Sequence, residues 1–360
     1  MTTRRNLPAE LADALDLVAP GTEFRDGIDN IIRASNGALV VVSNPQKLER
    51  LGIITGGIKM ELKFAPMRLY ELAKMDGAIV ASPDLSTIHY ANVQLSPDPS
   101  LVSEETGMRH IAAHRTAQQT GDLVVAVSER RRVVSLYEGP YGPHVLEDIG
   151  VALSKANSAL ATLEKFTRRL REEARLLTMH EYDGSVALRE VVGAIGTFEY
   201  TVRIADEIEA YVRELGREGR LVRMQLEEAF SNVPEQYLAL LKDYVEDDVD
   251  EREVLRRLHE CDSDVLSDTV EVAQLLGYSS VSRSDDFFLK PRGHRQLEGI
   301  PRLPRKVANS LIQEFGSLKE LLDASQDELD DVEGVGQARA RAIRRGLERQ
   351  KNLEPTGEIL

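Results

Sequence analysis

Two short segments carry the residue types of a nucleotide site. In the first, the carboxylate of Asp76 precedes Gly77, which has no side chain, and Ala78, which opens an apolar run. A buried strand would meet a ligand at such a point. In the second, the basic side chains of Arg109 and His110 follow a glycine at a predicted helix start. The first N–H groups of a helix are unpaired and partially positive, so this second segment suits an anionic ligand.

The end of the chain carries a motif for a different partner. Gly334 and Gly336 let the backbone turn tightly and approach another molecule closely, and the helix predicted after them offers N–H groups to a phosphate. Such a helix-hairpin-helix binds the nucleic-acid backbone without reading bases. If only one such hairpin were present, an ordinary glycine helix cap followed by a solvated basic helix would be the alternative to DNA binding. The side chains expected to contact DNA from this helix are Arg339, Arg341, Arg344 and Arg345.

A similar hairpin comes earlier in the chain. Gly299 and Arg302 precede a predicted helix over residues 307–315, with proline where the later hairpin has its second glycine. Residues 291–351 hold 12 Lys and Arg against 10 Asp and Glu, which is a net charge of +2. Since the whole chain has a net charge of −15, the other residues together carry −17. The pair of hairpins therefore predicts a local DNA-binding region in an otherwise acidic protein.

The elements that must position the first two segments belong to an α/β domain over residues 1–148. Alternation of helices with short β-rich runs indicates a central mixed sheet covered by helices. Asp76 would then lie at a strand start, and Arg109 at a helix start. Helices are predicted over residues 8–18, 25–34, 66–75 and 109–119, and strands over residues 38–42, 77–80, 88–93, 123–127 and 133–137.

Residues 149–290 are predicted to form a helical spacer domain, and residues 291–360 a domain with the tandem hairpins. Apolar residues recur at steps of three and four from Leu153 to Leu170, which indicates one long helix with a continuous apolar stripe. The fold class is therefore multidomain, α/β followed by all-α. Further helices are predicted over residues 185–213, 221–230 and 234–244, and a polar linker over residues 279–286.

Composition excludes several classes of protein. The chain has 360 residues, a net charge of −15 and a pI near 5.1, which argues against coating nucleic acid or an anionic membrane with its whole surface. A single cysteine, Cys261, excludes an internal disulfide framework and a cysteine metal cluster. No apolar run approaches a membrane span, and acidic residues interrupt the N-terminus where a signal peptide needs apolar ones. We expect a cytoplasmic, nucleoid-associated protein with no membrane partner.

Several unrelated motifs follow one another in one order along the chain. They occupy residues 74–80, 91–95, 97–99, 104–110, 119–121, 152–157, 219–221 and 277–278, and the terminal hairpins come after them. In this order the chain resembles the DisA family of diadenylate cyclases over nearly its whole length. The resemblance implies condensation of two ATP into cyclic di-AMP plus pyrophosphate, in a homo-octamer with face-to-face cyclase domains. It also implies sensing of branched DNA such as Holliday junctions, which restrains synthesis.

The resemblance further implies roles for individual residues. Asp76 would position a Mg²⁺ or Mn²⁺ ion and the attacking 3′-hydroxyl, and could take its proton; a carboxylate suits each task. Arg109 and His110 would face the phosphates, where charge moves onto the leaving pyrophosphate. The remaining residues expected to line the ATP site are Gly77, Ala78, Leu95 against adenine, Gly107 and Ser128.

The phosphate-facing segment departs from the family pattern. The family reads Gly-Thr-Arg-His-Arg-Thr/Ser-Ala, whereas Met108, Ile111 and Ala112 replace its two hydroxyl residues and its second arginine. Loss of a charge-assisted contact of about 2–4 kcal/mol would slow the reaction roughly thirty- to a thousandfold. Arg115, one helical turn later, could reach toward the space left by Ile111. The family commonly has a basic residue at that position already.

Three hypotheses follow. The first is an active diadenylate cyclase with a DNA-branch sensor. The second is a catalytically weakened, nucleotide-binding scaffold that binds DNA junctions. The third is a structural DNA-binding oligomer with no nucleotide role, in which Asp76 is a plain turn residue and Arg109 and His110 are solvated surface.

Overall fold

The computed structural model describes residues 9–139, 142–278 and 287–351. It contains two compact units, the first formed by Met1–Ala159 with Asp206–Gln225 and the second by Leu160–Ala205 with Leu226–Leu360. The predicted linker at residues 279–286 and the predicted first residue of the N-terminal helix lie outside the described residues. The three-domain division at residues 148 and 290 stays a prediction. Within the described ranges, no helix has an apolar stretch long enough to cross a bilayer.

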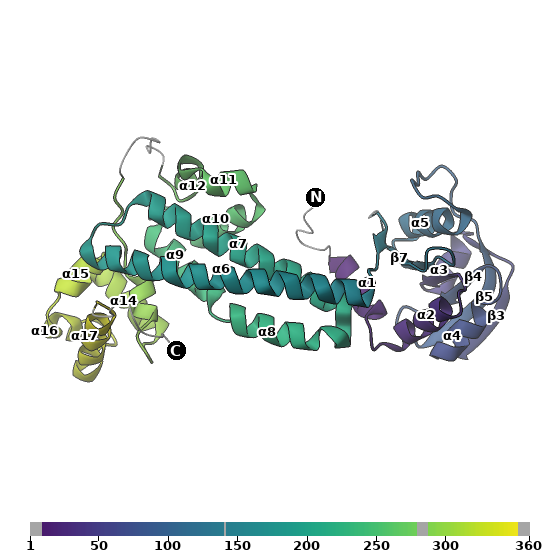
Figure 1. The fold of residues 1–360 in the computed structure, drawn as a ribbon, viewed down its shortest axis with the longest axis horizontal. Coiled ribbons are helices and arrows are strands. Elements are labelled where there is room, and N and C mark those ends of the chain that lie inside the picture. Colours follow the sequence, from purple (N-terminus) through teal and green to yellow (C-terminus); the bar gives the residue numbers. More distant parts are fainter. Residues whose placement is uncertain (1–8, 140–141, 279–286, 352–360) are drawn as a thin grey trace. The chain divides into compact units, whose positions relative to one another are not determined.

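The first unit is built on a mixed sheet, which confirms the predicted fold class (Figure 1). The strand order is β2-β5-β4-β1-β6-β7-β8, and β3 pairs with β5. β1 and β4 run parallel, whereas β1 with β6, β4 with β5, and β6 with β7 run antiparallel. The strands are β1 (Ala38–Val42), β2 (Ile54–Thr55), β3 (Ile58–Lys63), β4 (Ala78–Ala81), β5 (Thr87–Leu95), β6 (Leu123–Val127), β7 (Val134–Tyr137) and β8 (His144–Val145).

Helices cover both faces of this sheet (Figure 1). Alternate strand residues point to opposite faces, so Val40 joins one core with Phe24 while Val41 joins the other with Ala113. The first layer consists of α1 (Ala9–Val18), α2 (Glu23–Arg33) and α4 (Pro66–Leu72), and the second of α3 (Pro45–Arg50) and α5 (Met108–Thr120). Both segments of the predicted nucleotide site therefore lie in a three-layer α/β/α unit.

The structure adds elements that the sequence pattern did not indicate. β2 and β8 have two residues each, and α3 has six, which is too short for a periodic signal. β3 is largely exposed, and Lys59, Glu61 and Lys63 alternate with its apolar residues. No apolar run marks it, because it covers the outer side of β5 rather than the core.

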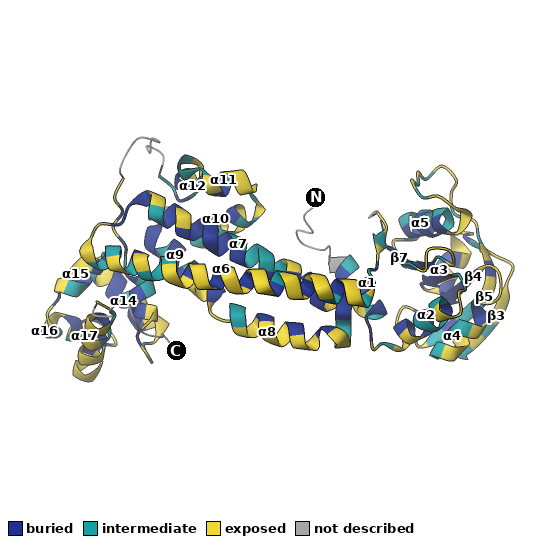
Figure 2. Cartoon of the chain, viewed as in Figure 1, coloured by how far each residue is buried: buried dark blue, intermediate teal, exposed yellow. Residues whose placement is uncertain are grey.

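Two long helices, α6 (Ile149–Asp183) and α7 (Leu188–Leu215), each contribute residues to both units. The predicted stripe on α6 is confirmed: Ala156, Leu160, Leu163 and Leu170 are buried, and exposed residues occupy the other side of the helix (Figure 2). The elements that follow α7 are η1 (Gly216–Gly219), α8 (Arg220–Phe230), α9 (Val233–Tyr244), α10 (Glu251–Glu260), α11 (Ser263–Ser267) and α12 (Thr269–Leu275).

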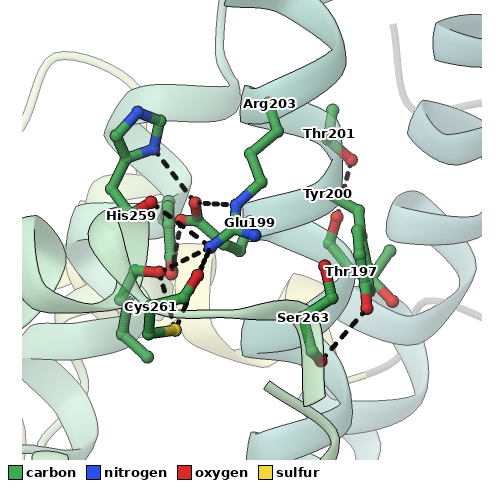
Figure 3. Close-up of polar contacts among 10 residues, drawn as sticks. Thr197, Glu199, Tyr200, Thr201, Arg203, His259, Cys261 and Ser263 are labelled. Atoms are coloured by element: carbon green, nitrogen blue, oxygen red, sulfur yellow. Dashed lines mark hydrogen bonds and ion pairs between the residues drawn. The ribbon is translucent and has the colours of Figure 1, made fainter. Parts of the chain in front are cut away.

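A buried carboxylate organises polar contacts in the core of the second unit (Figure 3). Glu199 on α7 is 0% exposed; its Oε1 accepts from Nε of Arg203 at 2.8 Å and lies 3.0 Å from Nδ1 of His259. The Tyr237 hydroxyl donates to Oε2 at 3.3 Å. Arg203 also donates to the carbonyl of Cys261, just after α10. The network thus gives a hydrogen-bond donor to a backbone carbonyl at the end of α10, and it joins α7, α9 and α10.

Five helices form the hairpin region of the second unit around one apolar core. They are α13 (His294–Glu298), α14 (Arg305–Phe315), α15 (Leu318–Asp323), α16 (Gln326–Asp330) and α17 (Gln337–Lys351). Asp243 at the end of α9 caps the first of them: its carboxylate accepts from the backbone N–H groups of Gly293, His294 and Arg295. These donors have no partner inside the helix.

The last turn of α6 contacts both hairpins. Oε1 of Glu181, which is 3% exposed, accepts from Nη1 of Arg295 and from the Tyr244 hydroxyl, both at 2.6 Å. The adjacent Tyr182 hydroxyl donates to the carbonyl of Leu347 on α17 at 3.1 Å. The end of one helix therefore holds α13 through a buried ion pair and α17 through a hydrogen bond.

Glu181→Ala should destabilise the second unit by roughly 3–5 kcal/mol, because it leaves the Arg295 guanidinium buried without its counter-ion. Chemical denaturation followed by circular dichroism measures the change. Glu253→Ala is the matched control, since Glu253 pairs with Arg256 on the exposed side of α10. This substitution should leave the denaturant concentration at the unfolding midpoint unchanged. Equal transitions for the two variants would contradict this account of the buried pair.

Candidate active site and nucleic-acid interface

Strand register brings the sequence-predicted nucleotide segments to one edge of the sheet. This edge is formed by the ends of strands and not by an outer strand. Parallel pairing sets Val40 opposite Ile79, so the starts of β1 and β4 lie side by side. Antiparallel pairing sets Ala38 opposite Val127 and Ala78 opposite Val93, so the ends of β6 and β5 reach the same edge. Helix α5 runs back toward the start of β6, which places its own start at this edge too.

Gly77 is required where β4 enters the sheet. Its φ of +91° suits glycine, and a Cβ there would lie 2.8 Å from the carbonyl oxygen of Val93. β5 is irregular at the same level, because Asn92 has a φ of +53° and the β4–β5 register shifts between Ala78 and Val80. Ala78 is buried against this backbone. Close approach of two strands thus leaves Asp76 projecting from the edge.

Asp76 is exposed, and within the described ranges it has no recorded hydrogen bond or ion pair. No three His, Cys, Asp or Glu residues of the described chain gather around a point where a metal ion could bind. A divalent ion that arrives with ATP needs only one or two protein carboxylates, because phosphate oxygens and water complete its shell. The free carboxylate of Asp76 fits that kind of ion.

Arg109 lies across the same edge. Its Nη1 donates to the carbonyl of Val127 at 3.4 Å, and a Cβ on Gly37 would lie 1.9 Å from that nitrogen. Extending the β1–β4 register back by three residues sets Gly37 beside Asp76. The absence of a side chain at Gly37 lets the guanidinium lie against the start of β1, the strand that pairs with β4.

His110 lies on the inner side of α5, apart from the exposed Arg109. It is 7% exposed, and its Nδ1 is 2.9 Å from the Tyr137 hydroxyl, which donates to Glu105 at 2.8 Å. Burial lowers the pKa of His110, against an opposing effect of Glu105. The sequence suggested that both basic side chains face phosphate, but the structure directs only Arg109 outward in this state.

The start of α5 is open. Gly107 has a φ of +104° and no side chain caps the helix, so its first N–H groups stay available for an anion. Met108 is 85% exposed, whereas Ile111 and Ala112 are half-buried. The proposed compensation by Arg115 finds no support in its contacts, since Nε of Arg115 donates to the carbonyl of Leu101 at 2.8 Å.

Leu95 and Ser128 lie at the ends of strands on this edge. Leu95 pairs with Ile54 and is half-buried against the core that contains Ala113. The Oγ of Ser128 accepts from the backbone N–H of Arg131 in the β6–β7 turn. Arg131 also lowers the pKa of His110 and of Tyr137 through its charge, after larger effects of burial and Glu105, and the sequence analysis did not single it out. Its signal was the basic run at residues 130–132, directly after Ser128.

The second hairpin has the open backbone that a phosphate needs. Gly334 adopts a φ of +84°, and no atom lies within 4 Å of a Cβ built on Gly336. Helix α17 begins at the next residue. The predicted arginines of this helix, Arg345 among them, are exposed. Arg339, Arg341 and Arg344 donate to the carbonyls of Gly334, Gln337 and Ala324, respectively.

The first hairpin is built differently from the expected glycine motif. Arg302, with a φ of +62°, occupies the position equivalent to Gly334, two residues before Pro304. Gly299 instead follows α13 with a φ of −71°, and a Cβ there would lie 2.6 Å from Nε2 of Gln350. Gly299 therefore permits packing against α17. Pro304 has no N–H, so this hairpin offers one donor fewer than the second.

Comparison with known proteins finds three family models along the chain. Residues 25–140 match the DisA bacterial checkpoint controller nucleotide-binding model, residues 146–284 match the DisA bacterial checkpoint controller linker region, and residues 297–354 match a helix-hairpin-helix motif. The first contains the edge with Asp76 and Arg109, and the last contains both hairpins.

Full-length relatives agree with these matches. The chain is 43% identical over 340 residues to the DNA integrity scanning protein DisA of Clostridium kluyveri, covering 94% of this chain and 95% of that protein. It is 42% identical over 342 residues to that of Bacillus subtilis, covering 94% of each. A structure of a DacA double mutant from Staphylococcus aureus is similar at a TM-score of 0.29 and 20% identity, over 38% of this chain and 88% of that one. On the full-length matches, the chain belongs to the DisA family of DNA integrity scanning proteins.

Proposed function

We propose that the edge formed by Asp76, Gly77 and Arg109 carries the family's reaction, the condensation of two ATP into cyclic di-AMP plus pyrophosphate. The observation that carries this proposal is the convergence of a free carboxylate, a guanidinium and an open helix start on one edge of the sheet. The helical and hairpin regions of the chain couple this diadenylate cyclase to DNA.

Each half-reaction joins two nucleotides. The 3′-oxygen of one ATP forms a bond to the α-phosphorus of the other, and the bond from that phosphorus to the bridging oxygen breaks. Pyrophosphate leaves with the electron pair, and the 3′-hydroxyl proton passes to a base, for which Asp76 is the candidate. Two such steps close the ring and release two pyrophosphates. Half a site on each of two facing subunits therefore suffices.

The described residues divide the work of binding. Gly77 and Ala78 leave the nucleotide room at the start of β4, Leu95 offers an apolar contact for adenine, and Ser128 lies just after β6. Arg109 and the N–H groups after Gly107 face the phosphates, where they stabilise the charge that develops on pyrophosphate.

The metal is a divalent ion bound with ATP, and we propose Mg²⁺ or Mn²⁺ held by Asp76. When bound, it neutralises charge on the phosphates. The altered residues Met108, Ile111 and Ala112 support a further proposal, that turnover is weaker than the family pattern would give. The alternative function is a nucleotide-binding scaffold at DNA junctions that has lost turnover.

For the hairpins, we propose branched DNA such as Holliday junctions as the ligand and a homo-octamer with face-to-face cyclase domains as the assembly. Contacts to the phosphate backbone recognise the shape of DNA rather than its sequence. Several copies of the hairpin region in one oligomer increase the apparent affinity. A DNA partner would make the protein nucleoid-associated in the cytoplasm.

Asp76→Asn should reduce cyclic di-AMP synthesis at least about a hundredfold, because the amide neither accepts the proton nor balances the ion's charge. Chromatography of the products formed from ATP with Mg²⁺ or Mn²⁺ measures this. Asp84→Asn is the matched control, since Asp84 lies in the turn at the opposite end of β4. Unchanged synthesis in Asp76→Asn, or no product from folded wild-type protein at high concentration, would refute the proposed site.

Ile111→Arg should raise synthesis roughly thirty- to a thousandfold if a phosphate contact of about 2–4 kcal/mol is restored. Ile111→Leu controls for repacking, because it keeps the volume without adding charge. The same product assay compares the two. If neither Ile111→Arg nor its combination with Met108→Thr and Ala112→Thr increases the rate, the proposal that these positions weaken turnover is wrong.

Gly336→Ala should weaken DNA binding roughly tenfold, since a hydrogen bond to a charged phosphate contributes about 1.5–3 kcal/mol and the added methyl holds the phosphate away. The folded chain has room for this methyl, as it does for the control Gly142→Ala in the cyclase unit. Electrophoretic mobility shifts with a four-way junction and a linear duplex, over several salt concentrations, measure affinity. Equal affinity for junction and duplex would contradict the branched-DNA proposal, and unaltered binding by Gly336→Ala would exclude this hairpin.

A further inference from the structure

Glu105, Tyr137 and His110 form a chain of hydrogen bonds beside the start of α5, in which Tyr137 and His110 are buried and Glu105 is half-buried. Glu105 precedes the helix, Tyr137 ends β7 and His110 lies in the first turn, so three separate segments meet. The Tyr137 hydroxyl lies 2.9 Å from Nδ1 of His110 and 2.8 Å from Oε1 of Glu105. Nothing in the reaction described above uses Tyr137 or Glu105.

The direction of these hydrogen bonds follows from the donors available. A carboxylate only accepts, so Tyr137 must donate its single hydroxyl hydrogen to Glu105. Burial, then the hydrogen bond to Glu105, raises the pKa of Tyr137, which keeps that hydrogen in place. The hydroxyl oxygen can then only accept from His110, so Nδ1 carries a hydrogen.

The tautomer of His110 is thereby determined. Burial lowers the pKa of His110, so the ring is neutral at neutral pH with Nδ1 protonated and a lone pair on Nε2. Among the described residues, Nε2 has no recorded hydrogen-bond partner. A lone pair repels a phosphate oxygen but attracts a hydroxyl hydrogen, so this ring is suited to a ribose hydroxyl.

We propose that Tyr137 and Glu105 are positioning residues that hold His110 in one tautomer, with Nε2 as a hydrogen-bond acceptor for a ribose hydroxyl of ATP. The inference rests on the proposed cyclase site, and it changes the role of His110 there from a phosphate donor to an acceptor. It adds two residues, from the loop before α5 and from β7, that the sequence did not single out.

The charges around His110 determine how it responds to pH. Glu105 faces it from the preceding loop and raises its pKa, whereas Arg131 on the β6–β7 turn and Arg109 on its own helix lower it. His114, one turn along α5, packs on Tyr137 with ring centroids 5.6 Å apart. Removing the Glu105 charge must therefore lower the pKa of His110 further.

The pH profile of synthesis tests the role of His110 as an acceptor. An acceptor must be neutral, so the rate should fall as pH drops through the pKa of His110. Glu105→Gln should then move this acidic limb to lower pH, a direction that mere structural damage does not produce. A limb that moves to higher pH, or a rate that needs protonated His110, would overturn the proposal.

Tyr137→Phe provides a second variant. It should lower kcat roughly ten- to a hundredfold while changing KM for ATP much less, because the imidazole ring of His110 loses the hydrogen bond that orients it. Tyr90→Phe is the matched control: Tyr90 donates to Glu49 in the same unit at 2.5 Å, away from the start of α5. Equal effects of the two substitutions on kcat would refute a specific role for Tyr137.

Deuterium exchange at C2 of the histidine ring, read by peptide mass spectrometry, reports the pKa of His110 without any turnover. We expect a midpoint below 6.5, a further fall in Glu105→Gln and no change in Tyr90→Phe. A midpoint insensitive to Glu105→Gln would overturn the relay. If neither the wild-type protein nor any variant makes cyclic di-AMP, the proposed reaction is wrong. The exchange data alone then decide whether Glu105 and Tyr137 hold His110 in its neutral form.

Discussion

The close passage of β4 along β5 at Gly77 is the constraint on which the cyclase edge depends. Two backbones approach so closely that a Cβ would lie 2.8 Å from the carbonyl oxygen of Val93. Asp76 therefore emerges at the sheet edge. The parallel register of β1 with β4 then puts Gly37 beside it, and this second bare position accepts the guanidinium of Arg109. The two glycines therefore determine how the carboxylate and the guanidinium are placed along this edge.

Helix geometry gives the neighbours Arg109 and His110 opposite environments. Successive residues of an α-helix point about 100° apart, so one faces the open edge while the other turns inward toward β7. Arg109 reaches the open edge, where we propose that phosphates bind. His110 meets Tyr137 and Glu105 instead, where burial favours the neutral ring. One short motif thus supplies two kinds of chemistry.

The second unit combines its apolar cores with buried carboxylates. Glu199 joins three helices, while Glu181 and Asp243 hold the first hairpin helix through Arg295. Buried charges cost desolvation energy: burial, together with the charge of Glu181, raises the pKa of Asp243 to about 7. Several donors around each carboxylate offset part of this cost. Their directionality specifies one orientation of α13, which apolar packing alone would define less sharply. The two hairpins nevertheless differ, since Pro304 removes a donor that the second one retains.

Local patterns in the sequence determined β1, β4, β5, β6 and β7, the stripe of α6, and the glycine hairpin at Gly334, because periodicity and turn chemistry act over a few residues. They also singled out Asp76. They could not indicate the partners of His110 or Asp243, which lie 27 and 50 residues away along the chain. Nor could they show that Arg302, rather than Gly299, takes the positive-φ position of the first hairpin. Those features were decided by the tertiary structure, because hydrogen-bond direction and burial exist only once distant segments are packed together.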